Sequence, residues 1–370
     1  MITLLPEQRI IGQLSSPVAG PMLVAVGGLH GNEPAGAHAL VRVIDNLRRD
    51  APLVRGDMLA LAGNLKALHT GERFVDEDLN RRFSRRPADA RVAEDAERVE
   101  LIELLDDAFV RARGPVVLLD LHTTSGKGAP FGVFADTMVS RNFARRFPVP
   151  LVLGLEEQLE GTLVDFVGLI GHVAVGFEGG QHEDPKSIDH LAAIVWLALA
   201  HLGLVARSVE TERNVLLHAA EDAPRILEVT YRHEVASGDG FLMLPGFRSF
   251  EPIEQGRIIA EDVKGDVVVP EGGYLLMPLY QKQGNDGFFV VQKVWVFWLW
   301  LSALARYARA GRVVHWLPGV ERVDDEDHSV LVHRHVARWY SLQFLHLLGF
   351  RRREERGDLL VMERRAHDLP

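Results

Sequence analysis

Short apolar runs alternate with longer segments through residues 20–205, a pattern typical of βα units that build a largely parallel sheet. The predicted strands are Met22–Val26, Asp57–Ala62, Val116–Leu121, Gly132–Ala135, Leu151–Leu153 and Val173–Phe177. The predicted helices are Ala35–Leu47, Ala93–Arg111, Ser140–Phe147 and Ser187–His201. Arg85–Ala90 is predicted to be a polar loop. The first half of the chain therefore indicates an α/β domain.

The pattern changes after about residue 210. Arg225–Val290 contains short alternating strands, many glycines and turns such as Pro270–Gly273, so we expect a small β domain there. The chain beyond residue 290 differs again, because most of the tryptophans lie in it. We therefore predict an α/β domain over residues 1–210, a small β domain over 211–290 and a C-terminal extension of unknown role over 291–370.

Composition narrows the class of protein. The chain has 370 residues, of which 47% are hydrophobic and 25% charged, as in ordinary soluble globular proteins. A net charge of −10 argues against nucleic acid or an anionic membrane as a partner, but it leaves a small anionic substrate open. The absence of cysteine excludes disulfides and thiolate metal sites.

The location of the protein is predicted from two further segments. The N-terminus lacks a basic region followed by an apolar core, so we expect no signal peptide and a cytoplasmic protein. The longest apolar run, Val294–Ala305, is shorter than the ~20 residues that a membrane helix needs. We expect this Trp-rich run to be a buried element or the contact of a homo-oligomer.

The first predicted strand leads into a candidate metal site. Gly27 and Gly28 follow the strand, His30 and Glu33 come next, and Pro34 suits the start of a helix. A His and a Glu three residues apart on such a turn can reach one metal ion, and their donor atoms suit zinc. The same spacing recurs at His69/Glu72 and His218/Glu221. Only the first pair lies between an apolar strand and a helix.

Two more predicted strands lead into residues that can bind a metal or transfer a proton. Val116–Leu121 leads into His122, and Val173–Phe177 leads into Glu178. Ligands of open α/β sheets bind beyond the carboxyl ends of the strands. A His-x-x-Glu pair with a distant His supplies three ligands and leaves a fourth position open, as in catalytic zinc sites. A further carboxylate can serve as general base, and Gly179–Gly180 is expected to let a substrate approach the backbone.

Four motifs together resemble the succinylglutamate desuccinylase/aspartoacylase family, a branch of the zinc-carboxypeptidase-like fold. They are His30–Glu33, Asp78–Phe83, Asp120–Thr124 and Glu178. The resemblance covers residues 20–205 and extends more loosely to about 290, through Leu275–Pro278 and Gly287–Phe289. It implies a mixed, largely parallel sheet flanked by helices, followed by a smaller C-terminal β domain, with the C-terminal tail as an addition.

The resemblance also implies roles for single residues. One zinc ion per chain would be bound by His30, Glu33 and His122. Glu178 would be the general base, and Arg73 would polarise the substrate carbonyl and stabilise the oxyanion. Asn80 and Arg81 would hold a substrate carboxylate. The implied activity is zinc-dependent hydrolysis of the linear amide of a small N-acyl amino acid or similar acylated amine.

Other functions remain open at this point. A zinc carboxypeptidase acting on peptides or cell-wall fragments, or a non-catalytic binding protein on the same fold, would show similar motifs. Neither the acyl group nor the amine is identified by the sequence. Tyr274 and Tyr280 lie near the region where the substrate's amino-acid half is expected, but no motif assigns them. His328, His333 and His335 are expected to face solvent.

Each site residue also has a structural alternative. Arg81 and Arg82 could form a solvated face, and Arg73 could pair with Asp76 or Glu77. Glu178 could be an ion-pair partner at a strand end. His30 and His122 could be hydrogen-bonded or packed histidines. Asp120, which shares a strand face with His122, could either orient that ligand or be structural.

Overall fold

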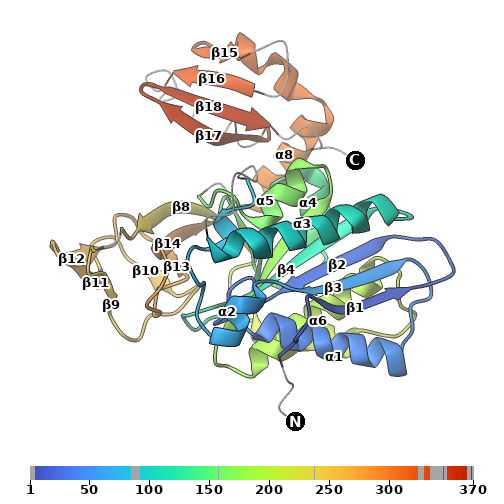
Figure 1. Cartoon of the computed structure of the whole chain (residues 1–370). Coiled ribbons are helices and arrows are strands. Elements are labelled where there is room, and N and C mark those ends of the chain that lie inside the picture. The colour runs from blue at the N-terminus through green and yellow to red at the C-terminus, as the bar shows by residue number, and fades with distance from the viewer. Residues whose placement is uncertain are drawn as a thin grey trace.

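The computed structural model describes residues 5–84, 92–156, 158–236, 238–323, 329–333, 345, 348–364 and 368, so the predicted loop at 85–90 lies outside the described residues. In this part of the chain 11 strands form one mixed sheet, in the order β1-β3-β2-β4-β7-β5-β6-β8-β14-β13-β10 (Figure 1). Their bounds are β1 Ile10–Ser15, β2 Met22–Gly27, β3 Asp57–Ala62, β4 Val116–Thr124, β5 Phe131–Phe134, β6 Leu151–Leu153, β7 Val173–Gln181, β8 Ile226–Glu234, β10 Pro252–Ile253, β13 Gly273–Leu276 and β14 Asp286–Lys293.

The central strands β3, β2, β4 and β7 pair in parallel, and β2, β3 and β4 are buried along their whole length. Helices cover both faces of this region, which explains why the strands are continuously apolar. α1 (Ala35–Arg49) and α6 (Lys186–His201) pack on one face, with α4 (Met138–Ala144). α3 (Ala93–Arg111) and α5 (Leu163–Leu169) cover the other (Figure 1). The predicted mixed α/β fold is confirmed.

The strands and helices predicted between residues 20 and 205 are all present. The prediction missed the edge strand β1 and four short helical segments, α2 (Leu65–Thr70), η1 (Leu79–Arg81), α5 and α7 (Glu210–Ala219). Each is short or half exposed, so its apolar pattern is weak. β4 and β7 also run further than predicted, to Thr124 and Gln181, so that His122 and Glu178 are paired within the sheet. The apolar pattern stops before these strands end, because His122 and Glu178 line the pocket.

The strands of the predicted β domain divide between two sheets. β8, β14, β13 and β10 extend the main sheet through the parallel pair β6–β8. β9 (Leu242–Met243), β11 (Ile258–Asp262) and β12 (Gly265–Val268) form a separate three-stranded sheet with its own apolar cluster. Alternation in the sequence identifies such strands but does not say which strand each one pairs with.

The C-terminal extension is folded in its described part. α8 (Val296–Tyr307) and η2 (Ala310–Trp316) precede a four-stranded sheet of β15 (Val320–Arg322), β16 (Ser329–His333), β17 (Phe350–Arg356) and β18 (Leu359–Arg364) (Figure 1). The fully buried Arg306 ties α8 to the α/β core through Asp136, 2.7 Å away, and also lies 3.0 Å from Asp368 near the C-terminus. No helix of the described residues combines the length and the apolar character that crossing a bilayer requires.

Self-association through Val294–Ala305 stays a prediction, and α8 supports it by exposing aromatic side chains. Trp300 of α8 is 61% exposed, and Trp295, which immediately precedes the helix, is 77% exposed. We expect the chain to dimerise or oligomerise at micromolar concentration and Trp300→Glu to shift it toward monomer in analytical ultracentrifugation. Val110→Glu, at an exposed apolar residue of α3, is the control and should leave the distribution unchanged. A wild-type chain that sediments as a monomer would contradict the prediction.

Candidate metal centre and active site

The turn after β2 is built around glycines. Gly28 has a φ of 79°, which favours glycine. A Cβ on Gly31 would lie 1.9 Å from the Ala67 carbonyl oxygen of α2, so no larger residue fits there. The Gly31 amide donates to the Arg73 carbonyl at 3.2 Å. Pro34 caps α1, and the turn therefore holds its side chains between α1, α2 and the segment around Arg73.

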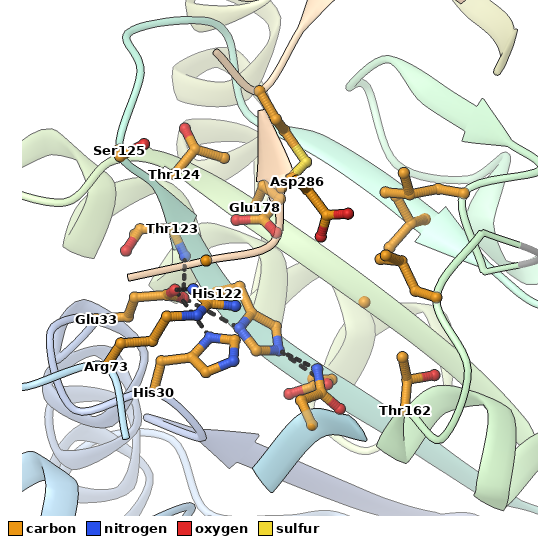
Figure 2. A pocket seen from close by; sticks show the side chains of 18 of the residues that line it. His30, Glu33, Arg73, His122, Thr123, Thr124, Ser125, Thr162, Glu178 and Asp286 are labelled. Atoms are coloured by element: carbon orange, nitrogen blue, oxygen red, sulfur yellow. Dashed lines mark hydrogen bonds and ion pairs between the residues drawn. The ribbon is translucent and has the colours of Figure 1, made fainter. Parts of the chain in front are cut away.

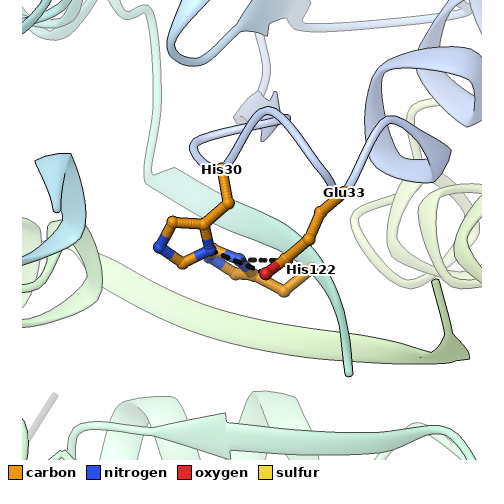
Figure 3. A group of neighbouring side chains, drawn as sticks. All are labelled: His30, Glu33 and His122. Atoms are coloured by element: carbon orange, nitrogen blue, oxygen red, sulfur yellow. Dashed lines mark hydrogen bonds and ion pairs between the residues drawn. The ribbon is translucent and has the colours of Figure 1, made fainter. Parts of the chain in front are cut away.

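The three candidate metal ligands lie together (Figure 3). Nδ1 of His30 is 2.8 Å from Oε1 of Glu33, and Nδ1 of His122 is 3.1 Å from Oε2 of Glu33. One donor atom from each side chain lies within 4.8 Å of the others, and all three residues are buried. The turn after β2 and the end of β4 therefore bring the predicted donor set to one point.

The opposite nitrogen of each histidine faces a second carboxylate. Nε2 of His30 is 3.0 Å from Asp78, and Nε2 of His122 is 2.9 Å from Asp120. Histidines that bind metals commonly direct their other nitrogen to a carboxylate in this way, which fixes the ring and its tautomer. The donor set fits zinc, and Asp120 lies where it can orient His122. Asp78 belongs to a motif that the sequence identified, but its contact with His30 was not predicted.

Glu33 and His122 stabilise each other in their charged forms. Burial alone would raise the pKa of Glu33, but the charges of His30 and His122 and their hydrogen bonds hold that pKa well below its usual range. Burial likewise opposes protonation of His122, yet Asp120 and Glu33 raise its pKa well above the ordinary value. Protons and a metal cation would compete for these same atoms.

Arg73 is bound to the ligand cluster. Its guanidinium donates to Oε1 of Glu33 at 3.1 Å and to Asp78 at 3.0 Å. Burial opposes the charge of Arg73, but Asp78 and Glu33 outweigh it and raise its pKa. The alternative pairing with Asp76 or Glu77 is wrong, because the side chain turns inward and lines the pocket.

Glu178 lies beside the cluster on the neighbouring strand, in register with His122 (Figure 2). Its Oε2 is buried without a hydrogen-bond partner, and no described residue forms an ion pair with it, so the strand-end ion pair is not observed. Burial raises the pKa of Glu178 to about 8; His122 and Arg73 act against this, and Glu33 and Asp120 add to it. A cation bound nearby would favour its carboxylate form.

The glycines after Glu178 do not serve the substrate. A Cβ on Gly179 would lie 2.5 Å from Leu191 Cγ and 2.9 Å from the Ser187 carbonyl oxygen, both in α6. Gly180 has a φ of 125°, and a Cβ added to it would lie 3.0 Å from Ser187 Oγ. Neither lines the pocket. The expectation that they admit a substrate is wrong, because they admit the close approach of α6.

Asn80 and Arg81 both line the pocket but are already engaged. The Asn80 side chain accepts a hydrogen bond from the Leu163 amide at 2.8 Å, and its nitrogen lies 3.4 Å from His122 Nε2. Arg81 donates to Asp286 at 3.2 Å. It therefore forms a partly buried ion pair and does not belong to a solvated face. Asp286 comes from β14, and no sequence signal connected it with Arg81.

The remaining candidates lie away from the site. Arg82 was expected at the surface, but it is buried and donates to Asp95 at 2.6 Å, because η1 turns it against α3. The Tyr280 hydroxyl donates to the Leu244 carbonyl, and neither Tyr280 nor Tyr274 lines the pocket. His333 lies 3.4 Å from Glu321. His328 and His335 lie outside the described residues.

The cluster and its neighbours line one pocket, and the empty space within it is about 910 Å³ when open solvent is counted. Figure 2 shows His30, Glu33, Arg73 and His122 gathered together, with Thr162 across the pocket. The sequence reasoning missed several lining residues, namely Thr123, Thr124, Ser125, His182, Gln281 and Asp286. The first three follow His122 directly along the chain, so their place after a ligand was the available signal.

Known proteins resemble the part of the chain that holds the candidate site. Residues 19–202 match the succinylglutamate desuccinylase/aspartoacylase catalytic domain. A succinylglutamate desuccinylase of Burkholderia thailandensis is 35% identical over 100 residues, 26% of this chain and 29% of that protein. The alignment thus spans less than a third of that relative.

A longer match and a solved structure extend the likeness. A succinylglutamate desuccinylase of Pseudomonas fluorescens strain SBW25 is 34% identical over 273 residues, 70% of this chain and 79% of that protein. The crystal structure of a succinylglutamate desuccinylase/aspartoacylase from Rhodobacter sphaeroides shares the fold, with a TM-score of 0.55 and 19% identity over 75% of this chain and 87% of that one. The chain belongs to the succinylglutamate desuccinylase/aspartoacylase family, a family of deacylases.

Proposed function

We propose that the protein is a zinc-dependent amidohydrolase that cleaves the amide bond of a small N-acyl amino acid or similar acylated amine. The observation that carries this proposal is the buried group of His30, Glu33 and His122 with the unpartnered Glu178 beside it. Membership in a deacylase family supports the reaction class.

His30, Glu33 and His122 would hold one zinc ion per chain. Their atoms are two imidazole nitrogens and a carboxylate oxygen, the donor types of catalytic zinc sites with three protein ligands. When bound, zinc would act as a Lewis acid that activates water and polarises a carbonyl group. Asp78 and Asp120 would fix the two histidine rings.

Glu178 would move the proton. As a carboxylate it takes a proton from the attacking water, and it then gives that proton to the nitrogen of the leaving amine. The water oxygen would first add to the carbonyl carbon, and the bond between that carbon and the nitrogen would then break as the nitrogen receives the proton from Glu178. An oxygen of Glu178 without a hydrogen-bond partner is available for this transfer.

Arg73 would stabilise the negative charge that develops on the carbonyl oxygen. Two carboxylates hold the guanidinium in place before the reaction, so little reorganisation is needed. Asn80 and Arg81 would position a substrate carboxylate, with Arg81 sharing its charge between that group and Asp286.

Arg73→Lys is expected to lower kcat by about 100-fold, the scale of losing one oxyanion donor. Lysine keeps the charge but lacks the planar fork that contacts Glu33 and Asp78 together. Steady-state kinetics and zinc content measured on the same sample check this. Arg42→Lys, in an exposed ion pair with Asp189, is the matched control. Unchanged kcat in Arg73→Lys would remove Arg73 from the reaction.

The choice between this activity and a carboxypeptidase is tested by substrate form. The zinc-loaded chain should release amine from N-acetyl or N-succinyl amino acids faster than it releases the C-terminal residue from peptides of the same amino acids. Faster release from peptides would contradict the proposal and favour the carboxypeptidase.

A further inference from the structure

Part of the pocket lining is mainly apolar. It includes Val133, Leu155, Leu159, Val164 and Met277, and Glu156 and Thr162 are the polar lining residues of the same chain segment. Val164 belongs to the apolar cluster under α3 and α5, whereas the other four apolar residues belong to or pack against the cluster around Phe131. These walls are parts of two packed cores, and we call the space between them the apolar lobe.

Gly176 joins the apolar lobe to the reacting groups. It precedes Glu178 by two residues on β7, so both positions lie on the same face of the sheet, and it pairs with Val133 on β5. A Cβ on Gly176 would lie 2.9 Å from Val133 Cγ2 and 3.6 Å from Val164 Cγ2. The missing side chain therefore keeps the space beside Glu178 open.

The pocket has few basic side chains that could pair with a second substrate carboxylate, beyond the one assigned to Asn80 and Arg81. Among the described lining residues, the basic side chains besides the two ligand histidines are Arg73, Arg81 and His182. Arg73 contacts two carboxylates, and Arg81 contacts Asp286. His182 lies between neutral side chains, 2.8 Å from Thr123 and 3.0 Å from Gln281. A substrate carboxylate in the apolar lobe would be buried without a partner, which is strongly unfavourable.

We propose that the substrate places an uncharged apolar group in the apolar lobe. The substrate class is then an N-acyl amino acid with an aliphatic or aromatic side chain, or one with an aliphatic acyl chain. Both halves of succinylglutamate, by contrast, carry free carboxylates. This inference rests on the proposed hydrolase function and specifies the substrate of the same site.

A substrate panel for the zinc-loaded full-length chain tests the inference and separates the two halves of the substrate. N-acetyl-leucine and N-acetyl-phenylalanine vary the amine half, and N-hexanoyl-glycine varies the acyl half. N-acetyl-aspartate and N-succinyl-glutamate are the acidic comparisons. We expect kcat/KM to be at least about tenfold higher for one apolar arm than for the acidic substrates.

Two variant pairs connect that preference with the apolar lobe. Val164→Ala widens the lobe and should raise, roughly three- to tenfold, the preference for a larger over a smaller apolar group in whichever half of the substrate the panel assigns to the lobe. Val167→Ala, also buried in α5 but outside the pocket lining, should not. Leu159→Arg adds a cation at the partly exposed rim and should shift the preference toward acidic substrates. Leu169→Arg, at an exposed leucine outside the lining, should not.

The outcomes separate this inference from the proposed function. Faster cleavage of the acidic substrates, or a preference unaffected by both Val164→Ala and Leu159→Arg, would overturn the apolar lobe as a substrate site while the hydrolase stands. Absence of amine release from every member of the panel would overturn the proposed function itself.

Discussion

Glu178→Gln is expected to lower kcat by about 10²–10⁴-fold, the contribution typical of a general base. Glutamine has the same shape but cannot take up the proton. Because Glu178 is not one of the three clustered ligands, the variant should bind zinc as the wild type does. The measurement is kcat for amine release, together with zinc per chain determined on the same preparation.

Glu183→Gln is the matched control for Glu178→Gln. Glu183 is exposed and follows β7 by two residues, so the same change there should leave kcat within about twofold. Near-wild-type turnover in Glu178→Gln would show that another group moves the proton. Loss of zinc in that variant would instead place Glu178 among the ligands.

The pH profile should report the same carboxylate. Burial raises the pKa of Glu178 to about 8 in the chain without an ion. A bound cation stabilises the carboxylate, so the acid limb of kcat/KM in the zinc-loaded enzyme should fall below that value. Activity is then lost as the pH falls through this pKa, because the protonated form cannot act as base.

His122→Asn should lower zinc affinity by at least about 100-fold, the upper end of the loss seen when only an outer partner of a ligand is removed. Activity should fall with it. The remaining pair, His30 and Glu33, holds a cation less well because β4 then supplies no donor. Competition with a chelator of known affinity measures the loss.

Thermal unfolding gives a second readout for the metal site. Zinc at 100 times its dissociation constant should stabilise the wild type by about 2.7 kcal/mol, and His122→Asn should show little of this gain. His69→Asn is the control, because its His-x-x-Glu spacing matches but the residue is exposed on α2. A variant of His122 that binds zinc like the wild type would contradict the proposed ligand set.

The sequence indicated the centre of the site because its ligands follow strong local signals. His30 and Glu33 follow a buried strand and two glycines, and His122 directly follows another apolar run, Val116–Leu121. Parallel strands bring such ends to one edge of a sheet, so the convergence could be anticipated before any distance was known.

Contacts between distant segments could not be predicted in this way. Asp286 reaches Arg81 across 205 positions, and Arg82 is buried only because α3 packs over it. Gly179 likewise looked like a substrate-facing glycine, yet α6 decides its role. Such pairings depend on tertiary packing, which leaves no local pattern in the sequence.

The central claim is that zinc at His30, Glu33 and His122 supports hydrolysis of an N-acyl amino acid. The most direct test is free-amine release from a panel of N-acyl amino acids by the chain as purified, after zinc removal by a chelator, and after zinc is added back. We predict release that is lost on chelation and restored by zinc. Release that persists after zinc has been removed, or no release from any substrate by the zinc-loaded chain, would contradict the claim.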